Sequence, residues 1–144
     1  MSDRPGEARD FNTKIIEEFR ANQGRVDAEF LGGAPVILLH HIGARSGTER
    51  VTPVACSPQG EGRFAVWAAN GGSPAHPAWY HNLKAHPTIT VEVGTQTFTV
   101  LAEELDGTAR AQLWPKLVAQ YPSLGETQAK TTRPFPVFLL TRHD

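Results

Sequence analysis

Residues 35–57 read Pro35-Val36-Ile37-Leu38-Leu39-His40-His41-Ile42-Gly43-Ala44-Arg45-Ser46-Gly47-Thr48-Glu49-Arg50-Val51-Thr52-Pro53-Val54-Ala55-Cys56-Ser57. The apolar run over residues 35–42 predicts a buried strand, and residues 50–57 predict a second strand after a short turn. Two strands joined by so short a turn pair as antiparallel neighbours. Pro53 has no N–H to donate to a neighbouring strand, which predicts that the second strand is an edge, or is bulged, at this point.

The same patterns extend outward on both sides. Helices are expected over residues 11–23, 76–85 and 107–120, with Asp10, Pro77 and Asp106 at their starts. Further strands are expected over residues 63–69, 88–93, 96–103 and 135–141, and residues 122–134 form a loop or short helix. The strands are mostly joined by tight turns and do not alternate with crossover helices. The fold expected is therefore mainly β, a small antiparallel barrel of about six strands with peripheral helices.

Composition sets the class of protein. The chain has 144 residues, which predicts one domain over residues 1–144, and residues 1–10 are expected to form a flexible N-terminus. The net charge is −1 without a basic run, which disfavours nucleic-acid binding. The polar start lacks the pattern of a signal peptide, and the apolar run Val36–Leu39 is too short to span a bilayer. These features predict a cytoplasmic protein with no stable membrane insertion.

A turn over residues 43–50 carries the first binding signal. Glycine permits positive φ, so consecutive N–H groups around Ser46 and Gly47 can point into one concavity and hold an oxyanion. Arg45 and Arg50 flank these residues, and a guanidinium adds bidentate contacts to phosphate or carboxylate. The alternative is a solvated hairpin tip with two surface arginines.

A second glycine-rich turn lies within residues 68–80. Asn70-Gly71-Gly72 is typical of a type I′ hairpin turn. A helix is expected to follow soon after it, and the N-terminus of a helix after a glycine-rich loop is also an anion site. Trp67 and Trp79 are candidates for the core, but an aromatic ring beside such a turn can also wall a pocket for a flat ring.

The six histidines do not form a metal site by their spacing. His40 and His41 are neighbours in a strand and therefore face opposite sides. Three others are separated by five positions, which spreads them around a helix instead of along one face: His76, His81 and His86. No metal is expected, and polar or capping roles are preferred.

Several blocks of sequence carry a resemblance when taken together. In chain order they are Leu38-Leu39, Gly43-x-Arg45-Ser46-Gly47-x-x-Arg50-Val51-x-Pro53, Ala68-Ala69-Asn70-Gly71-Gly72, His76-Pro77-Ala78-Trp79-Tyr80-His81-Asn82-Leu83-Lys84-Ala85-His86-Pro87, Trp114-Pro115, Tyr121-Pro122 and Thr131-x-Arg133-x-x-Pro136-Val137. The order and spacing of these blocks, from about residue 11 to residue 141, resemble the deazaflavin-dependent nitroreductase and quinone reductase family. Members of this family use the reduced 8-hydroxy-5-deazaflavin coenzyme F-420.

The resemblance implies a split β-barrel related to flavin-mononucleotide-binding barrels, in agreement with the strand count. It also implies coenzyme F-420 as cofactor, with a phosphodiester and a glutamate tail as the anion. Arg45 and Arg50 would bind the phosphate and tail carboxylates, with Ser46 and Gly47 donating nearby. The deazaflavin ring would be lined by Thr52, Pro53, Ala68, Ala69, Asn70, Gly71, Gly72, Ala78 and Trp79.

Some positions depart from the family pattern. Ala44 and Asn70 stand where relatives often carry basic residues, although Asn70 can still form hydrogen bonds. The nitroreductase branch has a cluster of tyrosines over the substrate, and Tyr121 matches one of them. Tyr121 is thus the candidate to donate or orient a proton, with solvent as the alternative donor and a purely positional role for Tyr121 left open. Smaller or less polar groups elsewhere predict a roomy, apolar substrate pocket: Ala55, Ala69, Leu124 and Thr127.

The activity that the resemblance implies is hydride transfer from the reduced coenzyme to a small electrophilic acceptor. The acceptor would be a quinone or an α,β-unsaturated ester or lactone, and a separate dehydrogenase would re-reduce the coenzyme. Two alternatives remain open: an oxidoreductase that binds flavin mononucleotide (FMN), and a non-catalytic carrier of the deazaflavin. The oligomeric state does not follow from the sequence.

Overall fold

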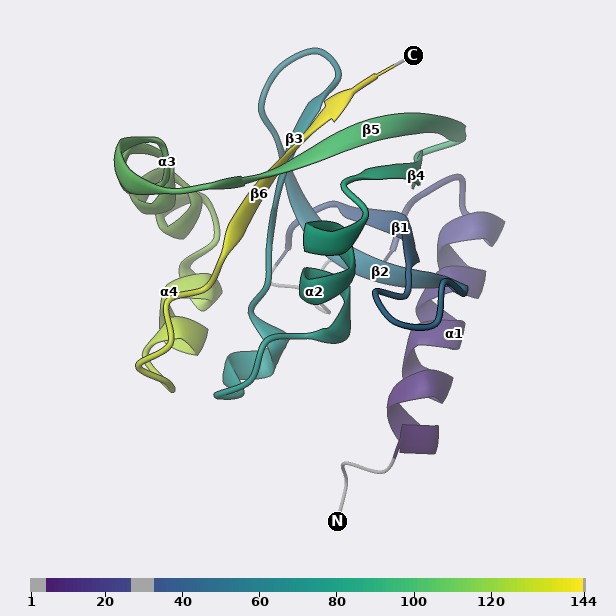
Figure 1. The fold of residues 1–144 in the computed structure, drawn as a ribbon, viewed down its shortest axis with the longest axis horizontal. Coiled ribbons are helices and arrows are strands. Elements are labelled where there is room, and N and C mark those ends of the chain that lie inside the picture. Colours follow the sequence, from purple (N-terminus) through teal and green to yellow (C-terminus); the bar gives the residue numbers. More distant parts are fainter. Residues whose placement is uncertain (1–4, 27–32, 144) are drawn as a thin grey trace.

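The computed structural model of the chain describes residues 5–26 and 33–143, with side chains from residue 11 onward. Figure 1 shows a twisted sheet curled on itself, with helices around it. The elements in chain order are α1 Pro5–Ala21, β1 Val36–Ile42, β2 Glu49–Pro58, β3 Arg63–Trp67, the 3₁₀ turn η1 Asn70–Gly72, α2 Ala78–Ala85, β4 Thr88–Val93, β5 Gln96–Leu105, α3 Gly107–Gln120, α4 Pro122–Gln128 and β6 Val137–Arg142.

The six strands form a closed antiparallel barrel in the order β1-β2-β3-β6-β5-β4. β1 and β4 close it, with Leu39 opposite Val91. The expectation of a small antiparallel barrel of six strands, with helices at the periphery, is confirmed. Closure gives each strand two neighbours over at least part of its length, so unpaired edges remain only where this pairing is partial.

Two long strands divide the barrel into halves. β2 pairs with β1 over residues 49–55 but with β3 only over Cys56, Ser57 and Pro58. In the same way, β5 pairs with β4 over residues 96–101 and with β6 over residues 100–105. At Pro53, β2 therefore has β1 as its one paired strand, which confirms the edge position expected from the missing N–H.

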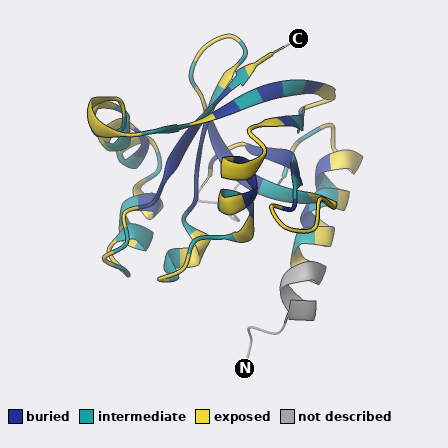
Figure 2. Ribbon diagram, in the orientation of Figure 1, coloured by how far each residue is buried: buried dark blue, intermediate teal, exposed yellow. Residues whose placement is uncertain are grey.

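The barrel interior forms the main core, and most of the dark blue in Figure 2 follows the strands. It joins aliphatic residues of all six strands to Phe138 of β6 and to Trp79 and Leu83 of α2. A second cluster lies under α3 and α4, where Leu117 and Leu124 pack near Phe135 and Trp67. Burial of a side chain such as Leu83 or Phe138 stabilises the fold by about 1.5–3 kcal/mol relative to exposure.

Helix α1 packs on the outside of the barrel. Ile15 and Phe19 are buried against Val36 and Leu38 of β1, and Arg20 forms an ion pair with Glu92 at 2.6 Å. This packing agrees with the peripheral position expected for the helices. In the described part of the chain, each helix falls short of the length and apolar character needed to cross a bilayer.

The helix boundaries correct several sequence expectations. α1 begins at Pro5, so Asp10 lies inside the helix rather than capping it, and residues 5–10 are helical where a flexible terminus was expected. Pro77 is the N-cap of α2 rather than its first residue, and the side chain of Asp106 makes no capping hydrogen bond to α3. Pro115 lies within α3 without ending it.

Gly24 supports a close contact between two turns, and its replacement is expected to be costly. Its φ is +92°, and a Cβ there would overlap the backbone of Gly94 in the β4–β5 turn. We expect Gly24→Ala to lower the free energy of unfolding by about 2–4 kcal/mol, the sum of left-handed strain and overpacking. Gly107→Ala is the control, because its φ is +48° and nothing lies within 4 Å of its Cβ position. Urea unfolding of both variants measures the difference, and equal losses would contradict the contact.

Candidate functional site

A cavity of about 630 Å³ lies where β2 separates from β3. Its walls come from the first half of β2, the end of β3, η1, the start of α2 and α1. The lining residues are Phe11, Asn12, His41, Arg50, Thr52, Pro53, Val54, Ala55, Trp67, Ala69, Asn70, Gly71, His76, Pro77, Ala78 and Trp79. A cavity of this size accommodates a cofactor-sized ligand.

The chemistry of the cavity suits a flat ring that carries an anion. Trp67 and Trp79 supply aromatic walls, and Ala55 adds a small apolar surface between strands. Within the described residues, β2 has no paired strand on the cavity side over residues 50–55, so backbone groups of that edge remain to contact a ligand. Arg50 supplies a cation among the lining residues and can bind phosphate or carboxylate.

The structure brings together part of the predicted site. The predicted residues that line the cavity are Arg50, Thr52, Pro53, Ala69, Asn70, Gly71, Ala78 and Trp79. The predicted residues outside its lining are Arg45, Ser46, Gly47, Ala68, Gly72 and Tyr121. Ala68 is fully buried in the barrel core, and a Cβ on Gly72 would face Lys130 and Thr127.

The turn after β1 uses its N–H groups within the protein. The N–H of Gly43 donates to Thr48 O, and that of Gly47 donates to Gly43 O, both at 2.9 Å. Ala44 donates to Asn82 Oδ1 at 2.9 Å, and Thr48 donates to Ser46 Oγ at 3.1 Å. These four N–H groups are therefore committed to the turn and to α2 and do not form an open anion nest.

The segment Asn70–Gly72 is a 3₁₀ turn that is followed by α2, which confirms the helix expected soon after it and rules out a turn between two paired strands. Asn70 and Gly71 have positive φ, at 47° and 65°. The type I′ turn has the same two positive φ angles, which is why the sequence resembles one. Asn70 Nδ2 donates to Ala75 O at 3.0 Å, so this amide holds the loop closed.

Tyr121 stands behind the cavity wall. It lies between α3 and α4, and its ring is tilted against Trp67 with the centroids 5.7 Å apart. Trp67 is the residue of this pair that lines the cavity. Tyr121 therefore supports an aromatic wall in this structure.

Arg133 organises the loop that follows β3, a role that the sequence did not reveal. Its guanidinium donates to the carbonyl oxygens of Ala68, Ala69 and Ser73 at 2.8–3.1 Å. It also donates to His76 Nδ1 at 2.9 Å. Because a guanidinium only donates, this contact requires an unprotonated Nδ1 and leaves Nε2 of His76 to carry the proton. Burial, with Arg133 nearby, lowers the pKa of His76, which favours the same neutral state.

His41 is a second histidine at the cavity that the sequence left without a role. It is only 2 % exposed, its Nε2 lies 2.8 Å from Thr52 Oγ1, and its Nδ1 lies 2.8 Å from Asn82 Nδ2. Burial lowers the pKa of His41 to about 4, with smaller contributions from the charges of Arg50 and His40. His41 is therefore neutral at physiological pH.

The low pKa of His41 predicts a loss of stability in mild acid. The unfolded chain takes up this proton below about pH 6.5, whereas the folded protein does so only near pH 4. Unfolding therefore binds protons between these values, and stability falls as the pH falls. From pH 7 to pH 5 this contributes about 2 kcal/mol. Urea unfolding at both pH values should show that the free energy of unfolding falls less between pH 7 and pH 5 in His41→Gln than in the wild type. The exposed control His86→Gln should show the same fall as the wild type. Equal losses in the wild type and His41→Gln would contradict the assignment.

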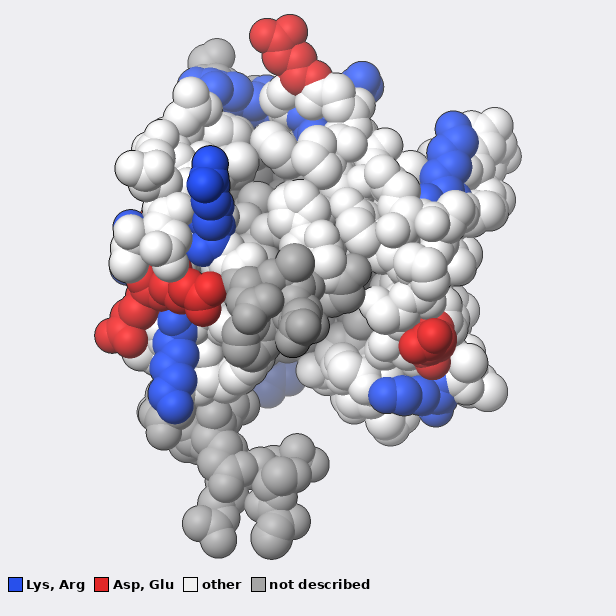
Figure 3. Space-filling model, turned by 180° about the vertical axis from the view of Figure 1, so that it is seen from behind, with Lys and Arg blue, Asp and Glu red and all other residues white. Residues whose placement is uncertain are grey.

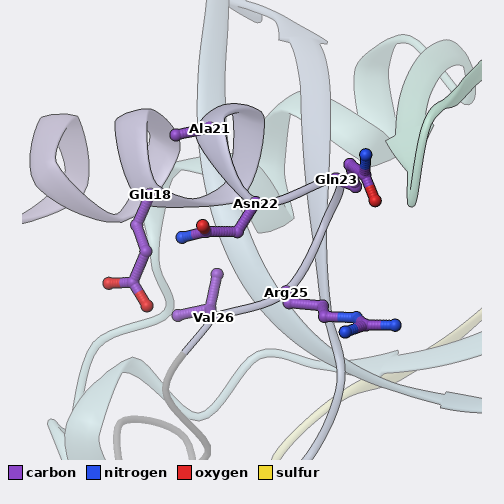
Figure 4. Close-up of a pocket in the computed structure, with 6 residues that line it drawn as sticks. All are labelled: Glu18, Ala21, Asn22, Gln23, Arg25 and Val26. Carbon is purple, nitrogen blue, oxygen red and sulfur yellow. The ribbon is translucent and has the colours of Figure 1, made fainter.

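A second hollow, of about 500 Å³, lies at the end of α1, away from the β2–β3 separation. Figure 4 shows Glu18 and Asn22 reaching from α1 toward Val26 on the chain that follows. Its other lining residues are Ala21, Gln23 and Arg25, so it contains none of the predicted site residues. The rear face in Figure 3 carries charged side chains of both signs, mainly around its edge. The candidate site therefore remains the cavity at the separation of β2 and β3.

Comparison with known proteins places this geometry in a family. The family model described as F420H(2)-dependent quinone reductase matches residues 12–142. An F420H(2)-dependent quinone reductase of Mycobacterium tuberculosis is 35% identical over 128 residues, which cover 86% of this chain and 85% of that protein.

Solved structures agree with that match. A structure described as F420-H2 dependent reductase (FDR-A) has a TM-score of 0.65 and 39% identity, and it covers 74% of this chain and 93% of its own. Another, described as a domain-swapped dimer, has a TM-score of 0.67 and 35% identity over 92% of this chain and 98% of its own. The motifs at the cavity, the split barrel and these matches agree: the chain belongs to the F420H(2)-dependent quinone reductase family, a family of deazaflavin-dependent reductases.

Proposed function

We propose that this chain binds reduced coenzyme F-420 in the cavity beside β2 and transfers hydride to a quinone or an α,β-unsaturated ester or lactone. The observation that carries the proposal is the unpaired edge of β2, residues 50–55, which faces two aromatic walls and ends at Arg50. Family membership implies coenzyme F-420 and gives no support to the FMN alternative.

The residues of the cavity fit the two halves of such a coenzyme. The ring half is flat and apolar with polar edges, and it matches Trp67 and Trp79 together with the polar edge of β2. The anionic half requires cations. Arg50 lines the cavity, and the exposed Arg45 lies on the turn that precedes β2, where it would meet the solvent-facing tail. Ser46 and Gly47 would contact the tail by their position beside Arg45.

The coenzyme supplies the hydride, from carbon 5 of its ring, and the protein supplies position and surroundings. Thr52 and Pro53 would hold one edge of the ring, while Trp79 and Ala78 cover it from α2. Phe11 and Asn12 of α1 also line the cavity. When the protein holds the coenzyme and the acceptor in fixed positions, a bimolecular reaction becomes a reaction within one complex.

The reduced acceptor also needs a proton. Tyr121 was the candidate from sequence, but in this structure it contacts Trp67 from outside the cavity lining. Tyr121 is therefore proposed to position the wall, with a proton role only for a substrate that reaches past Trp67. His76 and Thr52 are lining residues with exchangeable protons, and solvent supplies protons at the mouth.

The acceptor preference follows from the small residues at the cavity. Ala55 and Ala69 both line it, where larger or more polar groups stand in the nitroreductase branch. Leu124 is buried in the second core, and the Thr127 hydroxyl donates its hydrogen to Ser123 O, so neither has a hydrogen to donate to a substrate. Apolar pockets discriminate weakly, by about 1–3 kcal/mol per methylene-sized difference.

We therefore expect several planar quinones and enone lactones to be reduced, and bicyclic nitroimidazoles to be poor substrates. The measurement is kcat/KM with reduced coenzyme F-420 on a naphthoquinone, a coumarin-type lactone and a nitroimidazole, side by side. Ala55→Tyr restores bulk and a hydroxyl and should reduce tolerance for the larger quinone. A nitroimidazole with higher kcat/KM than both other acceptors would overturn this interpretation of the pocket.

The cellular setting is part of the same proposal. A separate deazaflavin-reducing dehydrogenase is proposed as the electron source, since the reaction consumes reduced coenzyme. We place the protein in the cytoplasm, where such a soluble coenzyme is regenerated. The described residues hold no helix able to span a bilayer, which supports this placement.

A further inference from the structure

A chain of hydrogen bonds leads from the turn after β1 to the cavity, and its direction is fixed at the first step. The N–H of Ala44 can only donate, and it lies 2.9 Å from one oxygen of the Asn82 amide, Oδ1. The other amide atom, Nδ2, must therefore point to His41, 2.8 Å from Nδ1. Backbone geometry thus settles the orientation of an amide that is 7 % exposed.

The orientation of Asn82 determines the protonation of His41. An amide NH₂ group donates, so His41 Nδ1 accepts and carries no proton. In the neutral ring the proton is then on Nε2, which lies 2.8 Å from Thr52 Oγ1 and donates to it. His41 is 2 % exposed, so water is poorly placed to substitute for either partner.

The last residue in this chain of hydrogen bonds is Thr52, which lines the cavity. Because the Thr52 oxygen accepts from His41, its own hydrogen must point elsewhere. No other acceptor for it is found among the described residues, and Thr52 lines the cavity. We infer that His41 is a positioning residue that fixes the Thr52 hydroxyl as a hydrogen-bond donor into the cavity, so that this position selects an acceptor atom on the ligand.

The identity of that atom rests on the proposed function. The deazaflavin ring carries carbonyl oxygens, which accept such a bond. A ligand with an N–H at this point would leave the Thr52 hydrogen without an acceptor once water is displaced, and an unsatisfied group of this kind is costly. The relay thus sets which edge of a ring faces β2.

The first test needs no ligand. Long-range ¹H–¹⁵N NMR spectra of the histidine rings at pH 7 report the tautomer of each ring. The His41 signal is assigned by its loss in His41→Gln and its persistence in His40→Gln. We expect the pattern of a neutral ring with the proton on Nε2. A proton on Nδ1, or a doubly protonated ring, would overturn the inference.

The second test measures the donor at Thr52. Fluorescence titration with coenzyme F-420 should give binding about five- to tenfold weaker in Thr52→Val, and within about twofold of wild type in Thr52→Ser. Thr99→Val removes a hydroxyl on β5, outside the cavity lining, and should leave affinity unchanged. Difference infrared spectra should show a carbonyl band of the bound ring shifted to lower frequency in the wild type and in Thr52→Ser, but not in Thr52→Val.

Two results would contradict the proposal that the Thr52 hydroxyl donates a hydrogen bond to the ligand. They are unchanged binding in Thr52→Val, and equal weakening by serine and valine. Absence of coenzyme binding in the wild type would instead remove the proposed function, and the NMR measurement would still decide the direction of the hydroxyl.

Discussion

Arg133→Met is expected to lower the free energy of unfolding by about 3–5 kcal/mol, because several charge-assisted hydrogen bonds disappear together. Arg133 is the shared donor to three carbonyl groups of the loop after β3 and to His76. Removing it leaves these acceptors without their partner in a partly buried loop. Urea unfolding of the variant against the wild type measures the loss.

Arg110→Met is the matched control for this prediction. Arg110 also uses a guanidinium inside the fold, but its hydrogen bonds go to one carbonyl oxygen, that of Phe135. A loss of about 1–2 kcal/mol is expected there. Arg133→Met should also weaken coenzyme binding, since its loop lines the cavity with Ala69, Asn70 and Gly71. Equal stability losses in the two variants would show that Arg133 does not organise the loop.

Arg50→Ala is expected to weaken binding of coenzyme F-420 by about 1.5–3 kcal/mol, which corresponds to about 10- to 150-fold in Kd. Arg50 lines the cavity and would meet the phosphodiester through charge-assisted hydrogen bonds. The effect should shrink at high salt, because Arg50 is exposed and its charge is screened. Titration of coenzyme fluorescence at two salt concentrations provides the measurement.

Two further variants, Arg45→Ala and Arg63→Ala, test whether the loss of affinity is specific to Arg50. Arg45 is expected to show a smaller loss, since it lies outside the cavity lining and would meet only the tail. Arg63 lies on β3, outside the cavity, and serves as a charge-matched control that should leave affinity unchanged. If both Arg50→Ala and Arg45→Ala bind coenzyme F-420 with wild-type affinity, the proposal that these two arginines bind its phosphodiester and tail is contradicted.

The barrel was predictable from sequence because its strands are short, apolar or alternating, and joined by tight turns. The edge at Pro53 was predictable for a chemical reason, the missing N–H. The start of α1 was not, because Asp10 has the chemistry of a cap whether it stands at a helix start or within the first turns. A long helix packed through Ile15 and Phe19 extends past such a local signal.

The candidate site was predictable in part. The motifs identified Thr52, Pro53 and Trp79, which lie on one cavity. The glycine pattern at residues 43–50 is the same whether the N–H groups face a ligand or one another, and the structure shows the second arrangement for Gly47.

The roles of His41, His76 and Arg133 depend on contacts between distant parts of the chain. His41 meets Asn82 at a separation of 41 positions, and Arg133 meets His76 at a separation of 57. Local spacing carries no information about such contacts, so the histidines could be assigned only to generic polar roles.

The central claim is tested most directly by a single turnover without oxygen. The protein is mixed with one equivalent of reduced coenzyme F-420 and then with a naphthoquinone, and the absorbance of the oxidised coenzyme is followed. The account predicts that this absorbance returns in step with quinone consumption, much faster than in the absence of protein, and more slowly in Arg50→Ala at limiting coenzyme. Recovery at the protein-free rate, with saturating coenzyme and quinone, would contradict the assignment of this cavity as a deazaflavin-dependent reductase site.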